Sequence, residues 1–578
     1  MGALRGSVRA SEIALALVGM MVGICGGLAV AAMSGIGQVL HAAFFNIPIT
    51  HRLSSSNSLN PVLVLLMPMA GGLVLGLVLW LSAKVRAWPM VDAIEANALH
   101  GGRMSFRDSM MLGAQTLISN GFGASVGLEA GYTQVSAAIA SKIGQFLHLR
   151  RNDMRIIVGC GAAAAISAAF DAPISGAFYA FELIIGTYTI GAVAPVMAAA
   201  LASNIVVKAL HHAVAPMPLS DFPTVGNGNY MAFIILGLIC GFIGIGLMRG
   251  VTLVEAGFRK IQISPFLWPA LGGLVVGCLA LVTPQVMSSG HGALHVDMTT
   301  QIPLLTLALL FLLKALASAV SIGSGFRGGL FFAALFLGAL LGKFLAELCL
   351  LIFPQIMLDP VTVAVIGMSA LTVAVVGGPL TMAFLALEMT GDYVITGIAL
   401  TAAVISSLTV RELFGYSFST WRLHLRGESI RSAHDVGWIR SLTVGKLMQS
   451  SVVTVKASMT LVEFRQRYPI GSVQSVIVVD AAARYVGLVW VSDAYASEGV
   501  EAEAASVHDL LRLPETFLLP NMNVKHAIEI FDKTASETLA VMENAETRKV
   551  VGQLTEAFAL RRYAEELDKA HRNVTGTI

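Results

Sequence analysis

The stretch that decides the fold runs from residue 159 to 186 and reads GCGAAAAISAAFDAPISGAFYAFELIIG. A related stretch occurs further along the chain, at 367–391, and reads GMSALTVAVVGGPLTMAFLALEMTG. Chance matches among small apolar residues are frequent, but here proline, phenylalanine and glutamate match as well. At one offset of 206 residues, without a gap, the aligned pairs are Pro173 and Pro379, Phe178 and Phe384, Ala180 and Ala386, and Glu182 and Glu388. The chain is therefore predicted to contain two related halves.

The composition around this repeat is typical of a membrane protein. Of the 578 residues 56% are hydrophobic and only 12% are charged, whereas soluble domains carry about 25% charged residues. Apolar runs follow one another from Glu12 to about Phe414, and a bilayer core of about 30 Å takes roughly 20 residues of helix, so a dozen or more segments fit. We expect a polytopic α-helical membrane protein. A net charge of +2 gives no sign of a nucleic-acid partner.

The character of the sequence changes after Trp421, where a basic segment leads into ordinary soluble sequence. Arg5 and Arg9 precede the first apolar run, which predicts a retained span and a cytoplasmic N-terminus. An even number of spans then places the tail on the same side. The expected domains are a transmembrane domain at 1–420 with halves of about 12–210 and 230–415, a basic linker at 421–440, two small α/β domains at 441–500 and 505–565, and a tail at 566–578.

Glycine-rich segments precede both copies of the repeat, and they are the candidate functional site. They read NGFGASVGLEA at 120–130 and SGFRGGLFFAA at 324–334. Duplicated halves with broken helices are typical of secondary transporters, whose site lies near the midplane where the breaks meet. A loop that leads into a helix leaves the first amides without partners at the positive end of the helix dipole, which suits an anion. The alternative is that these glycines only allow close helix packing.

Glu129 lies inside the first of these segments and has no basic residue near it in sequence. A carboxylate within the membrane is a functional hypothesis by default. When ionised it would compete with an anion, and when protonated it would yield, so we predict that it is both gate and proton carrier. Glu182 and Glu388 also suit a structural role at helix ends. Lys314 and Arg327 either add positive potential to an anion pathway or reach toward an interface.

Together these segments resemble the CLC family of chloride channels and chloride/proton antiporters, over essentially the whole chain. GLEAG at 127–131 is similar to that family's G-K/R-E-G-P motif, and GGLFFA at 328–333 to its G-x-F-x-P motif. The resemblance implies a homodimer with one anion pore per subunit, and each subunit built from two inverted repeats with broken helices. It implies that Glu129 is the gate. It also implies that backbone amides hold the anion, and these map onto Leu128, Ala130, Leu330, Phe331 and Phe332.

Several positions depart from the family pattern. Leu128 occupies the place of a basic residue. The family's serine motif falls near VRAWP, with Arg86 at the serine position, and its pore tyrosine falls at Ser419. We therefore take Arg86, Ser419 and Lys314 as candidate pore side chains. Leu183 stands where antiporters carry a second acid, so the sequence leaves channel and antiporter open, and it leaves the preferred anion open.

The soluble tail resembles a tandem pair of CBS domains, and this resemblance implies a regulatory module that binds adenine nucleotides. Asp493 and Thr555 are the nucleotide contacts that it suggests. Each copy of the ribose-binding pattern is incomplete, because Trp490 replaces a threonine in the first and Phe558 replaces the acid in the second. A dimerisation role is the alternative.

The sequence favours transport of chloride or a similar small anion, gated by Glu129, with or without coupling to proton antiport. An uncoupled voltage- or pH-gated chloride channel is the alternative, and a receptor with a nucleotide-binding tail and a vestigial pore is a remote one. The spans contain no metal-ligand spacing and no nucleophile with a base, so we expect neither an enzyme nor a metal site, and no required cofactor. The expected location is the inner (plasma) membrane, with the lipid bilayer, anions and protons as partners.

Overall fold

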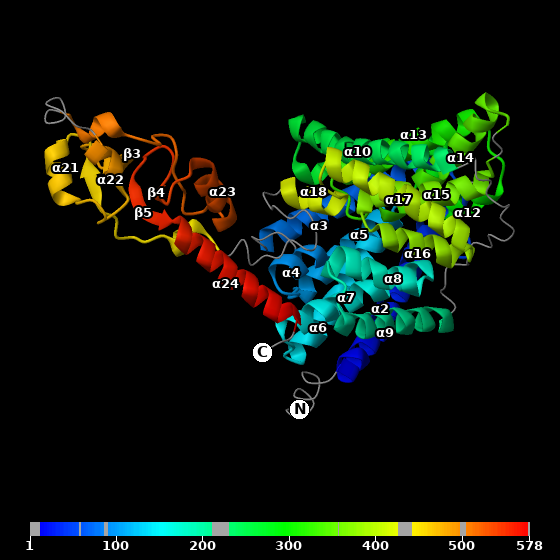
Figure 1. The fold of residues 1–578 in the computed structure, drawn as a ribbon. Helices are drawn as coiled ribbons and strands as arrows, with labels where there is room; N and C mark the ends of the chain where they lie inside the picture. Colours follow the sequence, from blue (N-terminus) through cyan, green and yellow to red (C-terminus); the bar gives the residue numbers. More distant parts are fainter. Residues whose placement is uncertain are drawn as a thin grey trace. The chain divides into compact units, whose positions relative to one another are not determined.

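The computed structural model describes residues 12–56, 59–85, 91–210, 230–355, 358–425, 442–496 and 505–575 (Figure 1). The chain divides into two compact units, Met1–Asp435 and Val436–Ile578. The first unit is helical, whereas the second combines short strands and helices. This is the polytopic helical protein with a small α/β part that the sequence predicts.

The first half of the membrane unit begins with one long helix, which covers the first apolar run without interruption. Its elements are α2 (Glu12–Phe45), η1 (Leu53–Ser55), α3 (Pro61–Val85), α4 (Ala93–Leu99), α5 (Phe106–Gly121), α6 (Glu129–Phe146), α7 (Arg151–Phe170), α8 (Pro173–Tyr179), the π-helix η2 (Ala180–Ile185) and α9 (Ile190–Ala209).

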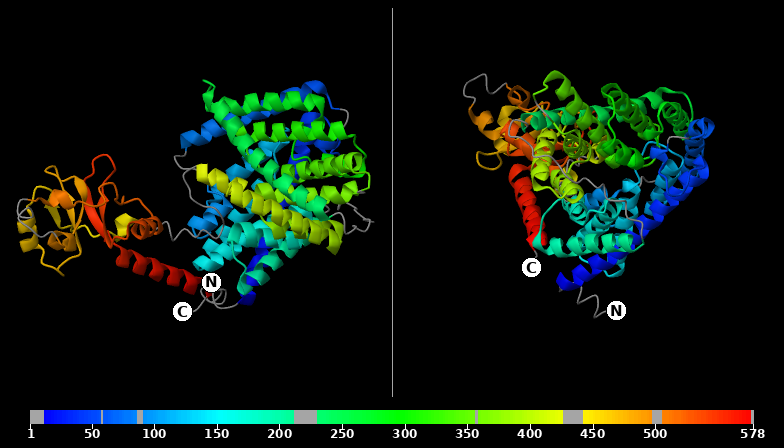
Figure 2. Two further views of the ribbon diagram at one scale, coloured as in Figure 1. Left: turned by 45° about the horizontal axis from the view of Figure 1, so that its top comes forward. Right: turned by 90° about the vertical axis from the view of Figure 1, so that its right-hand side faces the viewer.

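The second half follows the same plan of long helices separated by short breaks. Its elements are α10 (Tyr230–Lys260), η4 (Pro265–Leu267), α11 (Trp268–Val282), η5 (Pro284–Val286), α12 (His291–Thr299), α13 (Leu304–Gly323), α14 (Phe331–Ile352), α15 (Pro360–Val376), α16 (Pro379–Thr390), α17 (Tyr393–Leu413) and α18 (Phe418–Leu425). Figure 2 shows these helices crossing at many angles.

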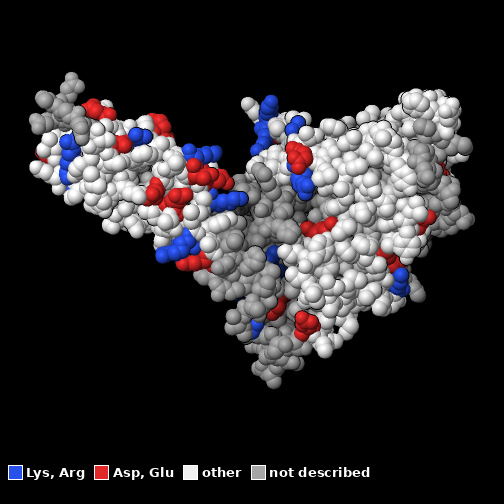
Figure 3. All heavy atoms as spheres, in the orientation of Figure 1, with Lys and Arg blue, Asp and Glu red and all other residues white. Residues whose placement is uncertain are grey.

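Within the described ranges, nine helices are long and apolar enough to cross a membrane, and three shorter apolar helices accompany them. The shorter ones are Pro173–Ile185, Pro360–Val376 and Pro379–Thr390. Figure 3 shows that most of the face of the helical unit in this view is uncharged, with only scattered charged side chains, while the tail carries both signs. An apolar outer surface of this kind suits lipid contact.

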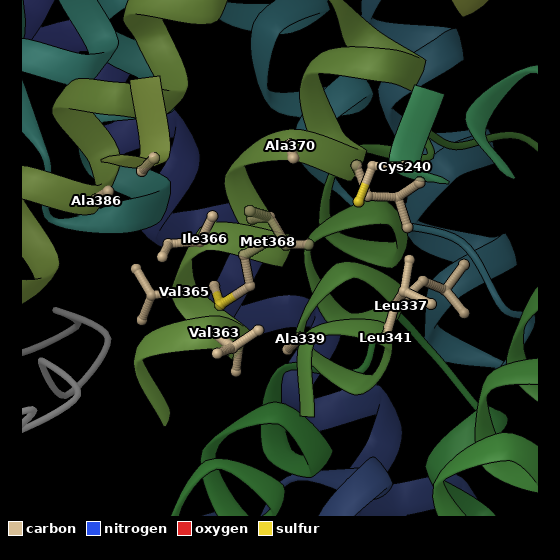
Figure 4. Packing of buried hydrophobic residues seen from close by; sticks show 14 of the residues in the cluster. Cys240, Leu337, Ala339, Leu341, Val363, Val365, Ile366, Met368, Ala370 and Ala386 are labelled. Carbon is tan, nitrogen blue, oxygen red and sulfur yellow. The ribbon is translucent and has the colours of Figure 1, made fainter. Parts of the chain in front are cut away.

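The core of the second half depends on a close approach of α14 and α15. A Cβ atom added at Gly338 would lie 2.3 Å from the carbonyl oxygen of Gly367, and one added at Gly367 would lie 2.4 Å from that of Gly338. Figure 4 shows Cys240 of α10 among the apolar side chains of these two helices, in the same buried cluster. Close contact between backbones is how helices gain packing energy in lipid.

The two repeat copies meet face to face. Pro173 is the first residue of α8 and Pro379 the first residue of α16, a position where proline's missing N–H has no helical partner to lose. The rings of Phe178 and Phe384 stack with centroids 4.2 Å apart. Residues that align in the repeat therefore lie against each other in the fold.

The aligned glutamates exchange helix caps between the halves. Glu182 accepts hydrogen bonds from the amides of Leu380 and Thr381, at 3.0 and 2.8 Å, and from the Thr381 hydroxyl at 2.6 Å. Glu388 accepts two amide hydrogen bonds from the first turn of α8, at 2.8 and 2.9 Å. Each carboxylate thus satisfies amides that the opposite half's helix cannot satisfy itself. These contacts favour the structural role over ion chemistry.

The tail unit contains two small motifs of similar order. In the first, β1 (Thr454–Lys456) pairs parallel with β2 (Ser475–Val479), which pairs antiparallel with β3 (Tyr485–Trp490). In the second, Leu518 bridges in parallel to β4 (Thr538–Met542), which pairs antiparallel with β5 (Val550–Thr555). The helices are α20 (Val444–Leu447), α21 (Leu461–Arg467), α22 (Val491–Ala496), η7 (Val507–Leu510), α23 (Val524–Thr534) and α24 (Glu556–Thr575).

Candidate functional site

The two glycine-rich segments meet in the membrane unit and bring two helix N-termini together. Helix α6 begins at Glu129 and helix α14 at Phe331. Just before them, Gly127 and Gly329 exchange two backbone hydrogen bonds, with N–O distances of 3.0 and 3.2 Å. The loop from each half is therefore fixed directly to the loop from the other.

The first turns of both helices present unpaired amides. The first helical hydrogen bonds run from residue 132 to the carbonyl of Leu128 and from residue 334 to that of Leu330. Neither of these N-cap residues has a side chain that caps the helix. Among the described residues, the amides of Ala130, Phe331 and Phe332 have no hydrogen-bond acceptor. Such N–H groups at the positive ends of two helix dipoles have the electrostatic character that attracts an anion.

Glu129 lies beside these amides and is almost fully enclosed. The side chain is 2% exposed, and neither carboxyl oxygen has a hydrogen-bond partner in the described part of the chain. The carboxyl group lies over Gly127, because a Cβ atom at that position would sit 1.9 Å from Oε2. Glycine before α6 therefore makes room for the glutamate side chain. This arrangement places a titratable group where it would meet an anion held at the helix ends.

A cavity of about 590 Å³ reaches this glutamate. It is bounded by residues from both halves, including residues of α18. The residues that the sequence predicts for the site and that the structure brings together around this cavity are Glu129, Ala130, Leu330, Phe331 and Ser419. Arg327, which the sequence also singles out, lines it too.

Two of the predicted amide residues have side chains that do not border this larger cavity. Leu128 borders a second, smaller cavity. The Phe332 ring stacks on the His291 ring with centroids 3.4 Å apart, and its side chain borders neither cavity. Arg86 lies outside the described residues.

Lys314, a candidate pore side chain, borders neither cavity. It is 1% exposed, and its ammonium group donates hydrogen bonds to the carbonyls of Val286 and Ser288 at 3.1 and 2.9 Å. A buried ammonium needs such acceptors because it has left its hydration shell. Lys314 therefore connects α13 to the segment before α12.

Tyr179, the last residue of α8, is a cavity residue that the sequence reasoning missed. Thr133 lines the same cavity and donates a hydrogen bond to the carbonyl of Glu129 at 2.9 Å. The only sequence signal was its place in the repeat, between the matched Phe178 and Ala180. That place predicts a helix end but not the direction of the side chain.

The candidate nucleotide residues in the tail have protein contacts of their own. The Asp493 carboxylate pairs with Arg512 at 2.7 Å, and the guanidinium of Arg512 lies 4.4 Å from the centre of the Trp490 ring. Thr555 ends β5 opposite Thr538. A nucleotide at Asp493 would have to share or displace Arg512.

The membrane unit matches known proteins. The family described as voltage gated chloride channel matches residues 70–411. A protein of Ralstonia nicotianae named as a ClcB-like chloride channel is 35% identical over 340 residues, which cover 57% of this chain and 78% of that protein. The voltage-gated ClC-type chloride channel ClcB of Escherichia coli is 29% identical, covering 71% of this chain and 98% of ClcB.

Solved structures share the fold. The structure of a slow cyanobacterial Cl⁻/H⁺ antiporter has a TM-score of 0.62 at 23% identity, covering 71% of this chain and 97% of that one. A eukaryotic CLC transporter has a TM-score of 0.60 at 17% identity, covering 94% and 97%. With the paired helix N-termini and the matched segment, these likenesses show that the chain is a multi-pass membrane protein and a member of the voltage gated chloride channel (CLC) family.

Proposed function

We propose that this protein carries chloride, or a similarly small inorganic anion, across the membrane through the site between α6 and α14. The observation that supports this most directly is the group of unpaired first-turn amides held together by the Gly127–Gly329 bridge. Backbone dipoles attract an anion without the full charge of a lysine or arginine. Binding of that strength permits release, which conduction requires.

Glu129 acts as the gate in this proposal. Its carboxyl group lies beside the amides of α6. An ionised carboxylate repels an anion at the same helix ends, whereas a protonated carboxyl group does not. Because the larger cavity reaches this side chain, water can carry protons to it. Anion passage is then expected to increase as the pH falls.

Proton coupling is the finer part of the proposal, and one observation favours the uncoupled alternative. Leu183 occupies the position where the resembling antiporters carry an acid, and a Cβ atom at Gly377 would lie 3.2 Å from its side chain. An apolar contact there supplies no proton relay. The cavity that borders Glu129 offers a water route instead. We keep antiport and an uncoupled chloride channel as the two forms of this function.

The proposal also includes the oligomeric state, the location and the regulation of the protein. The protein is a homodimer in the inner membrane with both termini in the cytoplasm, and it catalyses no chemical reaction. The tail is a regulatory module whose ligand is an adenine nucleotide. The contacts of Asp493 with Arg512 make nucleotide titration of the purified protein a direct test of that last point.

Reconstituted flux tests the central claim. Chloride efflux from liposomes is measured between pH 4.5 and 7.5 (from roughly the ordinary pKa of a glutamate to about 3 units above it, the range reached by buried carboxyl groups in proteins) for the wild type, Glu129→Gln and the control Glu412→Gln. Glu412 lies exposed near the end of α17, away from the cavity. We expect flux to rise toward low pH in the wild type and the control, and to be independent of pH in Glu129→Gln. A chloride gradient that drives protons uphill identifies antiport. Unchanged pH dependence in Glu129→Gln would overturn the gate.

A further inference from the structure

A second cavity lies on the opposite side of the Leu128–Glu129 segment from the larger one. Its volume is about 50 Å³, and roughly 10–15 Å³ of such space is enough for one water molecule. Leu128 borders this cavity, while the next residue, Glu129, borders the larger one. The two cavities share no lining residue. The start of α6 therefore forms a partition between two spaces, each large enough for a small ion.

The small cavity carries positive charge and no negative counterpart. Arg52 is its one cationic residue, apart from two histidines, and no aspartate or glutamate lines it among the described residues. Within the same described part of the chain, the guanidinium group of Arg52 has no hydrogen-bond or ion-pair partner. A half-buried guanidinium without a counter-charge retains its attraction for an anion. The cavity therefore has the charge of an anion-binding site.

Hydrogen-bonding groups surround Arg52. His41 contacts the carbonyl of Asn120 through Nε2 at 2.9 Å, which leaves Nδ1 without a bond to that group. His291 contacts the hydroxyl of Ser289 through Nδ1 at 2.6 Å, which leaves Nε2. With the Ser289 hydroxyl donating to Nδ1, the His291 ring keeps an Nε2–H that can donate to an anion or to a water. The His41 ring donates through Nε2 to the Asn120 carbonyl, so its Nδ1 can only accept, for example from a water. One full charge with a neutral donor in the same cavity gives attraction without a closed cage.

The cavity also lies on a defined side of the membrane unit. Helix α2 has 34 residues, and at 1.5 Å per residue it is about 51 Å long, more than the thickness of a bilayer core. His41 belongs to the last turns of this helix, and Arg52 follows in the loop after it. The cavity therefore lies toward the face opposite Glu12, at which α2 begins. Under the proposed topology this is the extracytoplasmic face.

We infer that the Arg52 cavity is a capture site for a small inorganic anion, on the far side of the Leu128–Glu129 partition from the large cavity. The inference rests on the proposed function, because the captured anion is the transported one. Leu128 stands where the first motif of the family has a basic residue. In this proposal Arg52 supplies the positive charge that the motif lacks. A fixed charge in a narrow cleft raises the local anion concentration and the rate of capture.

A bromide soak of wild-type crystals tests the site without a mutation or a flux measurement. We expect an anomalous bromide peak beside the Arg52 guanidinium, separate from a peak at the N-termini of α6 and α14. A peak at the helix ends and none beside Arg52 would overturn the capture site and leave the proposed function standing. A peak beside Arg52 and none at the helix ends would support the Arg52 site and count against the proposed site between α6 and α14.

Flux measurements then test whether the captured anion is used. Chloride is varied on the face that holds the Arg52 cavity, for the wild type, Arg52→Gln, Arg52→Lys and the control Arg259→Gln. Arg259 is exposed and pairs with Glu255 on α10. We expect Arg52→Gln to raise the half-saturating chloride concentration on the order of tenfold, with maximal flux unchanged, since focusing in charged clefts increases association by about 10 to 10³.

Arg52→Lys keeps the charge, so its half-saturating chloride concentration is expected to stay within about threefold of the wild type, which is less than the roughly tenfold change expected when the charge is lost. The control is expected to match the wild type. A half-saturating concentration that Arg52→Gln leaves unchanged would overturn the inference. Equal loss in Arg52→Gln and Arg52→Lys, with the bromide peak absent in both, would also overturn it, because packing and not charge would then be the cause.

Discussion

Replacing Glu182 with glutamine removes a helix cap, and the structure sets the expected size of the effect. The carboxylate accepts three hydrogen bonds from the first turn of α16, at 3.0, 2.8 and 2.6 Å. Glutamine keeps one oxygen but replaces the other with an amide group that cannot accept. The loss of a hydrogen bond to a charged group costs about 1.5–3 kcal/mol. The lost negative charge at the helix N-terminus adds about 0.3–1 kcal/mol.

Together these terms predict that Glu182→Gln lowers the free energy of unfolding by about 2–4 kcal/mol. Because Glu182 is partly exposed, we expect a value near the lower end. Glu388→Gln removes one acceptor from a pair of bonds, so its effect should be smaller. Glu255→Gln is the matched control, because its exposed pair with Arg259 is worth about 0.3–0.5 kcal/mol.

The assay is thermal unfolding of the purified protein in detergent, followed by the size-exclusion peak that remains after heating. We expect the lowest midpoint for Glu182→Gln and an intermediate one for Glu388→Gln. The midpoint of the control Glu255→Gln should equal that of the wild type. Flux through the folded Glu182→Gln protein should keep its dependence on pH. A wild-type midpoint combined with altered pH dependence would show that Glu182 transfers protons and would refute the cap.

Three further substitutions test other parts of the structure. Gly127→Ala places a Cβ atom 1.9 Å from the Glu129 carboxyl group, so chloride flux is expected to lose its pH dependence while the melting midpoint changes little; retained pH dependence would contradict the close approach. Gly338→Val puts a branched side chain against the backbone of Gly367, and the overpacking, which costs about 1–3 kcal/mol, should lower the melting midpoint. A melting curve equal to that of the wild type would contradict the close approach of α14 and α15. Phe531→Ala empties a site 1% exposed in the tail core at a cost of about 3–5 kcal/mol; limited proteolysis should then remove the tail and leave the membrane unit intact, and a resistant tail would argue against that core.

The repeat was visible in the sequence, but the way its halves join was not. Matched prolines at 173 and 379 predicted two helix starts, and both helices begin there. The matched glutamates, Glu182 and Glu388, predict equivalent positions in the two halves. Their partners are amides about 200 residues away, and no local pattern identifies which helix end a carboxylate will reach. Tertiary arrangement decides that, so the exchange of caps required the structure.

For the site, local patterns in the sequence indicate where helix ends fall, and they say less about side-chain contacts. Glycines followed by an apolar run predict free amides at the starts of α6 and α14, and the sequence singles out Glu129 by its place between apolar residues without a basic neighbour. One lysine and one arginine show the limit of predicting the site from sequence. Lys314 is a candidate because it lies within an apolar span, yet its ammonium group is bonded to two backbone carbonyls. Arg52 lies in a polar loop, where a single arginine carries no signal, yet it borders a cavity without acids.

The exchange of caps between the halves also constrains how the protein is made. Helix α8 leaves the ribosome long before Glu388 does, so its first amides have no protein acceptor while synthesis continues. Backbone groups without partners are costly in a bilayer core. The nascent first half must therefore keep this helix end in contact with water, or with a membrane insertion partner, until α16 arrives. Assembly of the protein is complete only when its last broken helix has entered the membrane.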